Sequence, residues 1–231
     1  CDVTVAHIEI VCSTSPGVGG EHSWQVTIGE ITSEWSDVNT SYATAVVVNV
    51  YKDDDSTLSP SRSLPTNGTA SVIVEGSEFG PLPTSDVASP ISAEYVNLGL
   101  SDLAGRTYAV QCELIQAHVK LRCDVLPGVG HAHRWRVTVG ELTGSLSSVT
   151  TSYTSPSVTG LIPESLTLPT NGSATVSVHG MNFGPLPTSN FSSPVWAEYL
   201  NPSLPDFGGR SYFVHCELSV AHTVLLCQTL P

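Results

Sequence analysis

Apolar and polar residues alternate over short stretches of this chain, and no stretch repeats its apolar residues at the spacing of a helix. The alternating stretches are rich in β-branched and aromatic residues and are bounded by Gly, Pro, Asn and Ser. The clearest examples are residues 46–51, 70–74, 108–112, 119–123 and 135–139. The pattern predicts an all-β protein of the sandwich type.

The chain also repeats itself. Residues 16–30 recur as residues 127–141, and both copies contain Pro-Gly-Val-Gly, a tryptophan and a final Gly-Glu. A Leu-Pro-Thr-Asn-Gly motif occurs at residues 64–68 and again at 168–172. The period of roughly 105–110 residues is too long for one turn of a solenoid and suits a string of small domains.

Six cysteines follow the repeat, and the members of each successive pair are eleven residues apart. Three equal spacings indicate three local disulfides, because zinc sites use much closer cysteine pairs that are absent here. The predicted disulfides are Cys1–Cys12, Cys112–Cys123 and Cys216–Cys227. Structural disulfides persist in oxidising compartments, so they predict a secreted protein or one displayed at the cell surface.

The residues between paired cysteines predict β-hairpins. A two-residue turn at Ala6 and His7 would align the flanking residues on one apolar face. The expected opposite pairs are Cys1 and Cys12, Val3 and Ile10, Val5 and Ile8, Leu114 and Leu121, and Leu218 and Leu225. His118 and His222 recur in the same turns without further ligands at a fixed spacing, so we interpret these histidines as turn and packing residues.

The second half of the repeat resembles a known family. Asn-Gly-Thr/Ser-Ala is followed by alternating valines and by Gly-x-x-Phe-Gly, at residues 76–80 and 180–184. This order resembles the immunoglobulin-like IPT/TIG domain. The cysteine and Pro-Gly-Val-Gly…Trp segment is similar to the version found in long tandem arrays of extracellular and cell-surface proteins. The resemblance covers essentially the whole chain and implies tandem immunoglobulin-like β-sandwiches. The Pro-Leu-Pro-Thr-Ser insertions depart from the common pattern.

On this resemblance, residues 43–153 are expected to form one complete IPT-like domain. Residues 1–42 are then the C-terminal part of a preceding domain, and residues 154–231 are the N-terminal part of a further one. The chain starts at Cys1 rather than Met, so we expect a processed product or a piece of something longer. A half-sandwich exposes an unpaired edge and an open core, so a neighbouring copy or missing sequence should complete it.

Two ways of completing the outer domains stay open. The chain may be cut from a continuous array that supplies the missing strands covalently. Alternatively, residues 13–42 of one copy add to residues 154–231 of the next by head-to-tail strand addition, which builds a filament. Residues 1–12 duplicate residues 216–227, which argues against a clean exchange. Both arrangements give a linear string.

Charge and composition restrict the function. The chain has 21 acidic and 8 basic residues and a net charge of −13, so binding to nucleic acid or to an anionic membrane through charge is excluded. Charged residues make up only 13% of the chain, whereas Ser and Thr are abundant, so the surface is hydroxyl-rich. No apolar run approaches the length of a membrane span.

Four N-glycosylation sequons occur, at Asn39, Asn67, Asn171 and Asn190. Asn67 and Asn171 occupy the same place in two repeats, which favours them as sites of covalently attached glycans. The Asn-Gly sequence at both also favours a turn before a strand, and the two interpretations are compatible.

Trp24 and Trp135 lie on an alternating strand and are expected in the core. Trp196 has no counterpart in the other repeat and is a candidate contact residue, because exposed tryptophans often anchor interfaces. Gly-x-Ser-x-Gly, His-Glu-x-x-His and phosphate-binding glycine loops are absent, so we expect neither an enzyme nor a cofactor.

These features together predict a structural repeat subunit of an extracellular glycoprotein fibril or cell-surface appendage, assembled head to tail from copies of itself. The alternative is a receptor or adhesin ectodomain whose IPT repeats act as spacers and ligand-binding modules.

Overall fold

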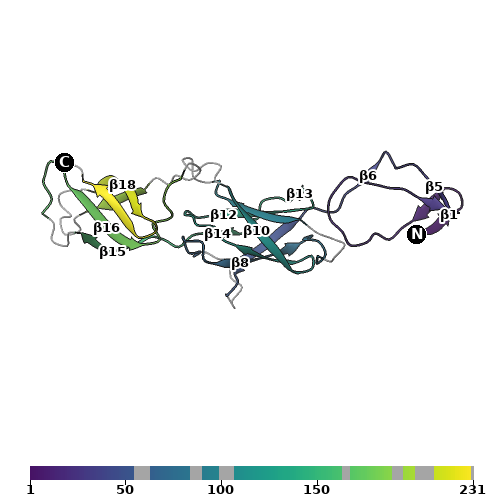
Figure 1. Cartoon of the computed structure of the whole chain (residues 1–231), viewed down its shortest axis with the longest axis horizontal. Coiled ribbons are helices and arrows are strands. Elements are labelled where there is room, and N and C mark those ends of the chain that lie inside the picture. Colours follow the sequence, from purple (N-terminus) through teal and green to yellow (C-terminus); the bar gives the residue numbers. More distant parts are fainter. Residues whose placement is uncertain are drawn as a thin grey trace.

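The computed structural model describes residues 1–54, 63–83, 90–98, 107–162, 167–188, 195–200 and 211–229. Every regular element within these residues is a β-strand, which confirms the predicted all-β class. Three strand-bearing parts follow one another along the long axis, with the N-terminus at one end and the C-terminal part at the other (Figure 1). We call them the N-terminal segment (1–42), the central unit (43–153) and the C-terminal unit (154–229).

The central unit is one sheet that folds over on itself. Its strands are β7 (Val46–Lys52), β8 (Ser71–Ser77), β9 (Ile91–Val96), β10 (Thr107–Gln116), β11 (Lys120–Asp124), β12 (His133–Val139), β13 (Leu142–Thr143) and β14 (Thr150–Thr151). The strand order is β13-β12-β9-β10-β11-β8-β7, and β14 also pairs with β12. The first half of the long strand β10 pairs with β9 and its second half pairs with β11, so β10 connects two layers.

One apolar core lies between these layers. Alternate residues of β12 are buried, as a period of two requires when one face of a strand packs inward. Trp135 and Val137 of β12 belong to the same buried cluster as Val50 of β7 and Val74 of β8. The central unit is therefore sandwich-like, with both layers contributing to its core.

The three disulfides join the predicted cysteines at the predicted spacing. Two of them tie hairpins of the central and C-terminal units, and the third ties β1 (Asp2–Val5) to β2 (Glu9–Val11). The predicted register is confirmed beside the cysteines, where Leu114 pairs with Leu121 and Leu218 with Leu225.

The predicted strand register is wrong at the tip of all three hairpins. Val5 pairs with Glu9 rather than with Ile8, because the register shifts beside the turn. The Ile8 amide donates to the Val5 carbonyl at 3.1 Å, and the intervening His7 has a left-handed φ of 65°. His118 and His222 adopt the same conformation, with a φ of 66° each. A turn residue with positive φ is usually Gly or Asn, so a histidine at this position does not indicate the turn conformation in the sequence.

The Gly-x-x-Phe-Gly motif supports the hairpin turn. The Phe79 amide donates to the His118 carbonyl at 3.2 Å, and the His118 amide donates to the Gly80 carbonyl at 2.7 Å. The C-terminal unit repeats both bonds between Phe183, Gly184 and His222. A Cβ at Gly76 would overlap the Val46 carbonyl oxygen, which explains why the motif begins with glycine.

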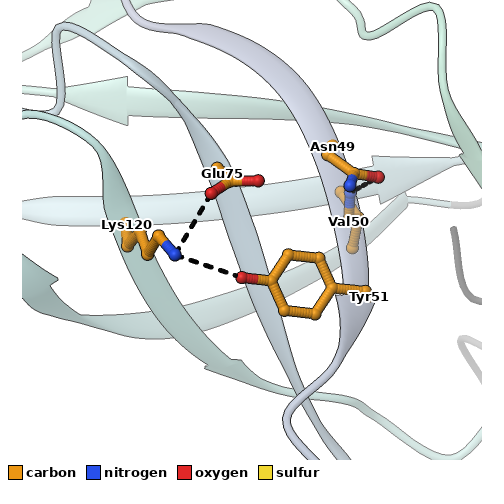
Figure 2. Close-up of polar contacts among 5 residues, drawn as sticks. All are labelled: Asn49, Val50, Tyr51, Glu75 and Lys120. Carbon is orange, nitrogen blue, oxygen red and sulfur yellow. Dashed lines mark hydrogen bonds and ion pairs between the residues drawn. The ribbon is translucent and has the colours of Figure 1, made fainter. Parts of the chain in front are cut away.

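A polar cluster crosses the outer surface of the β7–β8–β11 layer. The Lys120 ammonium lies 3.2 Å from the Glu75 carboxylate and donates to the Tyr51 hydroxyl at 3.5 Å (Figure 2). The hydrogen bonds to Glu75 and then to Tyr51 raise the pKa of Lys120 above its ordinary value. Val224 and His179 stand at the corresponding positions of the C-terminal unit, so this cluster belongs to one unit only.

The C-terminal unit repeats five strands of the central unit. They are β15 (Ser157–Ile162), β16 (Thr175–Met181), β17 (Val195–Tyr199), β18 (Tyr212–Val220) and β19 (Val224–Gln228). Their order, β15-β16-β19-β18-β17, matches β7-β8-β11-β10-β9 of the central unit. A smaller core forms around Val178, Phe183 and Leu225.

The N-terminal segment contains only short two-stranded ladders. Besides β1 and β2, its strands are β3 (His22–Ser23), β4 (Thr27–Ile28), β5 (Ile31–Thr32) and β6 (Asn39–Thr40). β3 pairs with β6, and β4 pairs with β5. Nearly every side chain of these strands is exposed, so the segment has no core of its own.

Candidate assembly interface

The C-terminal unit presents strand β17 as an edge. In the central unit the equivalent strand β9 lies between β10 and β12, and its second edge pairs Tyr95 with Trp135 and Ala93 with Val137. In the part of the C-terminal unit that the structure describes, β17 pairs only with β18. Tyr199 of β17 corresponds to Tyr95 of β9 in the repeat. The backbone edge of β17 that faces away from β18 has no strand partner among the described residues.

A cleft of about 520 Å³ opens beside this edge. Val178, Phe183, Val195, Ala197 and Leu225 line it from the C-terminal unit, and Val129 and Tyr153 are among the residues that line it from the central unit. The corresponding residues of the central unit are Val74, Phe79, Ile91, Ala93 and Leu121, and they pack in the same core as Val137 and Val139 of β12. The cleft therefore lies where a strand equivalent to β12 would place its side chains.

Residues 15–42 have the local structure of residues 126–153, although they cover no sheet. The Trp24 indole donates to the Thr40 hydroxyl at 3.0 Å, and the Trp135 indole donates to the Thr151 hydroxyl at 2.9 Å. Other bonds match in the same way. The Trp24 and Trp135 amides donate to the Ser36 and Ser147 hydroxyls at 2.8 and 2.9 Å, and the Tyr42 and Tyr153 hydroxyls donate to the Ser15 and Leu126 carbonyls at 2.7 and 2.6 Å.

These bonds explain how the segment keeps its shape. Polar side chains connect residues far apart within it, and these bonds are present although no second layer covers the segment. The repeat register includes Thr40 and Tyr42, but sequence reasoning assigned no role to these residues or to Ser36. Their recurrence as Ser147, Thr151 and Tyr153 was the available signal.

The expectation that Trp24 is a core residue is wrong. Trp24 exposes 40% of its surface, whereas Trp135 is fully buried. Ile28 exposes 63% and its counterpart Val139 only 4%. The two stretches have almost the same apolar pattern, but only the one in the central unit faces a sheet.

Two of the three hairpin histidines, His118 and His222, lie at the junctions between units. The His222 ring nitrogen Nδ1 and the Thr66 hydroxyl of the central unit share a hydrogen bond of 2.9 Å. Burial lowers the pKa of His222 below its ordinary value of 6.5. His118 lines a cleft with Gly17 and Tyr42 of the N-terminal segment. The predicted turn position of both histidines is confirmed, and the inter-unit contact adds a second role.

Three of the four sequons lie in the described residues. Asn67 and Asn171 are exposed, and each accepts hydrogen bonds from the residue two positions later, through Thr69 at 2.9 Å and Ser173 at 2.7 Å. Asn39 lies on β6, where its side-chain oxygen accepts a bond from Ser23 at 2.8 Å. Asn190 lies outside the described residues. Glycosylation at all four stays a prediction.

Trp196 exposes 64% of its surface on the outer face of β17, with its ring 5.0 Å from that of His215. It therefore lies next to the open edge. Within the described ranges, no group of three or more His, Cys, Asp or Glu side chains is placed to hold a metal ion. The same residues contain no helix long and apolar enough to cross a membrane.

Comparison with known proteins identifies no relative: no family model matches the chain, and no curated protein is significantly similar to it. The function is therefore inferred from the geometry of the molecule.

Proposed function

We propose that this chain is a structural repeat subunit of an extracellular glycoprotein fibril or cell-surface appendage, built from tandem immunoglobulin-like units of the IPT/TIG type that are arranged head to tail. It acts through its shape and its ends, and we assign it no catalytic role and no cofactor.

One observation carries the proposal. The two ends of the chain present complementary halves of the sandwich that is complete in the central unit. The C-terminal unit has an open core beside β17, and the N-terminal segment holds the fold of the layer that would cover such a core. Surfaces that complement each other at opposite ends make contacts that do not close, so they produce a linear polymer.

Other features support an extracellular setting. Three disulfides suit an oxidising compartment. Asn67 and Asn171 are exposed at equivalent turns, so glycans attached there would recur once per unit along the string. A hydroxyl-rich, weakly charged surface is compatible with such a coat.

Electron microscopy of the native, secreted material tests the proposal. We expect filaments whose axial repeat matches the length of one or two units. Treatment with denaturant and no protease then separates a covalent array, which stays long, from a strand-exchanged polymer, which falls to single chains. Dispersed short rods would contradict the fibril.

Exposed Trp196 favours one alternative function. A receptor or adhesin ectodomain would use such a side chain, present in one repeat only, as part of a ligand-binding surface. Purified protein that stays monomeric and binds a defined ligand, with loss of binding in Trp196→Ala, would support this alternative.

A further inference from the structure

We infer that residues 15–42 of one copy dock on the C-terminal unit of a second copy, where they occupy the place that residues 126–153 hold in the central unit. This inference rests on the proposed function and specifies its interface. The occupant is a second copy of this chain, because the chain itself contains both the open site and a segment of the required structure.

The central unit supplies the strand register. There β12 runs antiparallel to β9 with Trp135 opposite Tyr95 and Val137 opposite Ala93. Transferring the repeat gives three inward-facing pairs between the two copies. They are Trp24 opposite Tyr199, Val26 opposite Ala197, and Ile28 opposite Val195. All three incoming side chains are exposed in the free segment, so docking buries them.

The aromatic residues fit this register. In the central unit, Trp135 stacks on Tyr95 with ring centroids 4.5 Å apart, and Tyr95 stacks on Tyr108 at 4.7 Å. The C-terminal unit already has the counterparts of Tyr95 and Tyr108, because Tyr199 stacks on Tyr212 with ring centroids 4.9 Å apart. Trp24 of the incoming copy completes this three-ring stack.

The apolar cleft fits the same segment. Val137 and Val139 pack against the central-unit counterparts of the cleft residues. Val26 and Ile28 of the incoming copy therefore fill part of the cleft of about 520 Å³. On the outer face, Gln25 replaces Arg136, and its amide group can donate a hydrogen bond to Glu198, the counterpart of Glu94.

Docking also reproduces the junction between units. In one chain His222 contacts Thr66 of the unit before it. In the docked pair, the incoming copy's His118 meets Thr170 of the receiving copy, since these residues occupy the same repeat positions. Each added copy thus repeats a junction that the structure already contains.

The hairpin of residues 1–12 does not enter the completed sandwich. Its place is already filled by β18 and β19 of the receiving copy, which carry the equivalent Cys216–Cys227 disulfide. The hairpin belongs to no larger sheet in the structure, so docking requires only that it lie outside the new unit.

Cysteine cross-linking of the full chain tests the interface. The double variant Gln25→Cys, Glu198→Cys places one new thiol on each side of a predicted antiparallel pair. Opposite residues in such a pair have Cα atoms about 4.5–5.5 Å apart, within the range that a disulfide spans. All six native cysteines are paired, so the new thiols are the free ones. We expect mild oxidation to give a ladder of dimers, trimers and longer species on a non-reducing denaturing gel.

Two controls sharpen the result. Gln25→Cys with Glu217→Cys moves the second thiol to an exposed position of β18 away from the edge, and no ladder should form. An equal mixture of the two single variants should give mixed dimers and nothing longer, because each copy then offers only one thiol.

The outcomes separate this interface from the fibril itself. A ladder in the double variant alone supports the docking. Filaments by electron microscopy without a ladder would overturn it while leaving the fibril in place, as in an array whose next residues supply the missing strands. A ladder in both double variants would also overturn it, because contact would then be unspecific. If the protein formed no filaments and gave no ladder, both proposals would be overturned.

Discussion

At several positions of this chain the residue type matters because two backbones approach closely or because a hairpin turns there. Gly76 and Gly180, at the same position of two repeats, allow strands to pack against a carbonyl oxygen and a phenylalanine ring. Histidines with positive φ close the hairpins, and His222 also contacts the neighbouring unit. Both features can be tested by substitutions that leave the rest of the chain unchanged.

Gly76→Ala should destabilise the central unit by about 1–3 kcal/mol, because its Cβ would overlap the Val46 carbonyl oxygen and force the strands apart. The free energy of unfolding in denaturant measures the effect. Gly160→Ala is the matched control, since nothing lies within 4 Å of its Cβ position. We expect the control to be neutral or slightly stabilising. Equal losses in the two variants would contradict the packing argument.

Acidification should weaken the junction at His222. Burial lowers the pKa of this histidine in the folded chain below the ordinary value of 6.5 that applies when unfolded. The unfolded state therefore binds the proton more readily, and the stabilisation present above pH 6.5 is lost as the pH falls from 6.5 through the folded-state pKa. The free energy of unfolding of the C-terminal unit, measured against pH, should show this slope.

The control for the pH prediction is His222→Asn. Asparagine tolerates a positive φ but does not titrate near neutrality, so the variant should lose that part of the slope. An unchanged slope would assign the pH dependence to other groups.

At the scale of elements, two stretches with the same sequence pattern differ in burial. Residues 22–28 and 133–139 alternate alike, yet only the second stretch is buried. Trp135→Ala should therefore cost about 3–5 kcal/mol of the central unit's stability, because a fully buried tryptophan leaves a large cavity. Trp24→Ala should change the unfolding of a dispersed chain little and should reduce assembly. Unfolding of the monomer and light scattering of concentrated protein separate the two effects, and equal losses of monomer stability would contradict them.

The disulfides should also differ in effect. Replacing Cys112 and Cys123 by Ala should destabilise the central unit by about 3 kcal/mol, since a short closed loop is lost from the unfolded state. The same replacement of Cys1 and Cys12 should leave that unit unchanged, because β1 and β2 pair only with each other. Thermal unfolding of the two double variants checks this, and a matching loss in the second variant would show that the hairpin supports the central unit.

The elements also show what the sequence could and could not predict. Strand positions, the repeat and the cysteine pairs follow from local patterns, and the structure has them. The exposure of Trp24 could not be predicted, because burial depends on what faces a strand and not on the strand's own residues. The register at the hairpin tips was missed because His7 occupies a conformation that Gly or Asn normally signals. The contact between His222 and Thr66 joins residues 156 positions apart, and no local pattern reports it.

At the scale of the whole molecule, the eight-stranded central unit lies between the five-stranded C-terminal unit and the short ladders of the N-terminal segment (Figure 1). If copies dock through β17 and residues 15–42, assembly protects these two segments and leaves the central unit unchanged. Hydrogen exchange of backbone amides can follow this difference, because exchange is slow only where a strand is paired and seldom opens.

We expect the β17 amides that point away from β18, and the amides of residues 22–28, to exchange quickly in dispersed chains and slowly in assembled ones. Amides of β9 and β12 should be protected in both samples, because their pairing lies within the central unit. These internal strands serve as the reference, and they correct for any general slowing in the polymer. Protection that appears along β15, at the opposite edge of the C-terminal sheet, while β17 stays unprotected would place the contact on the wrong edge. Protection that appears only at the outer edge of β17 and in residues 22–28 follows from strand addition at the edge where β9 has a further partner and β17, among the described residues, has none.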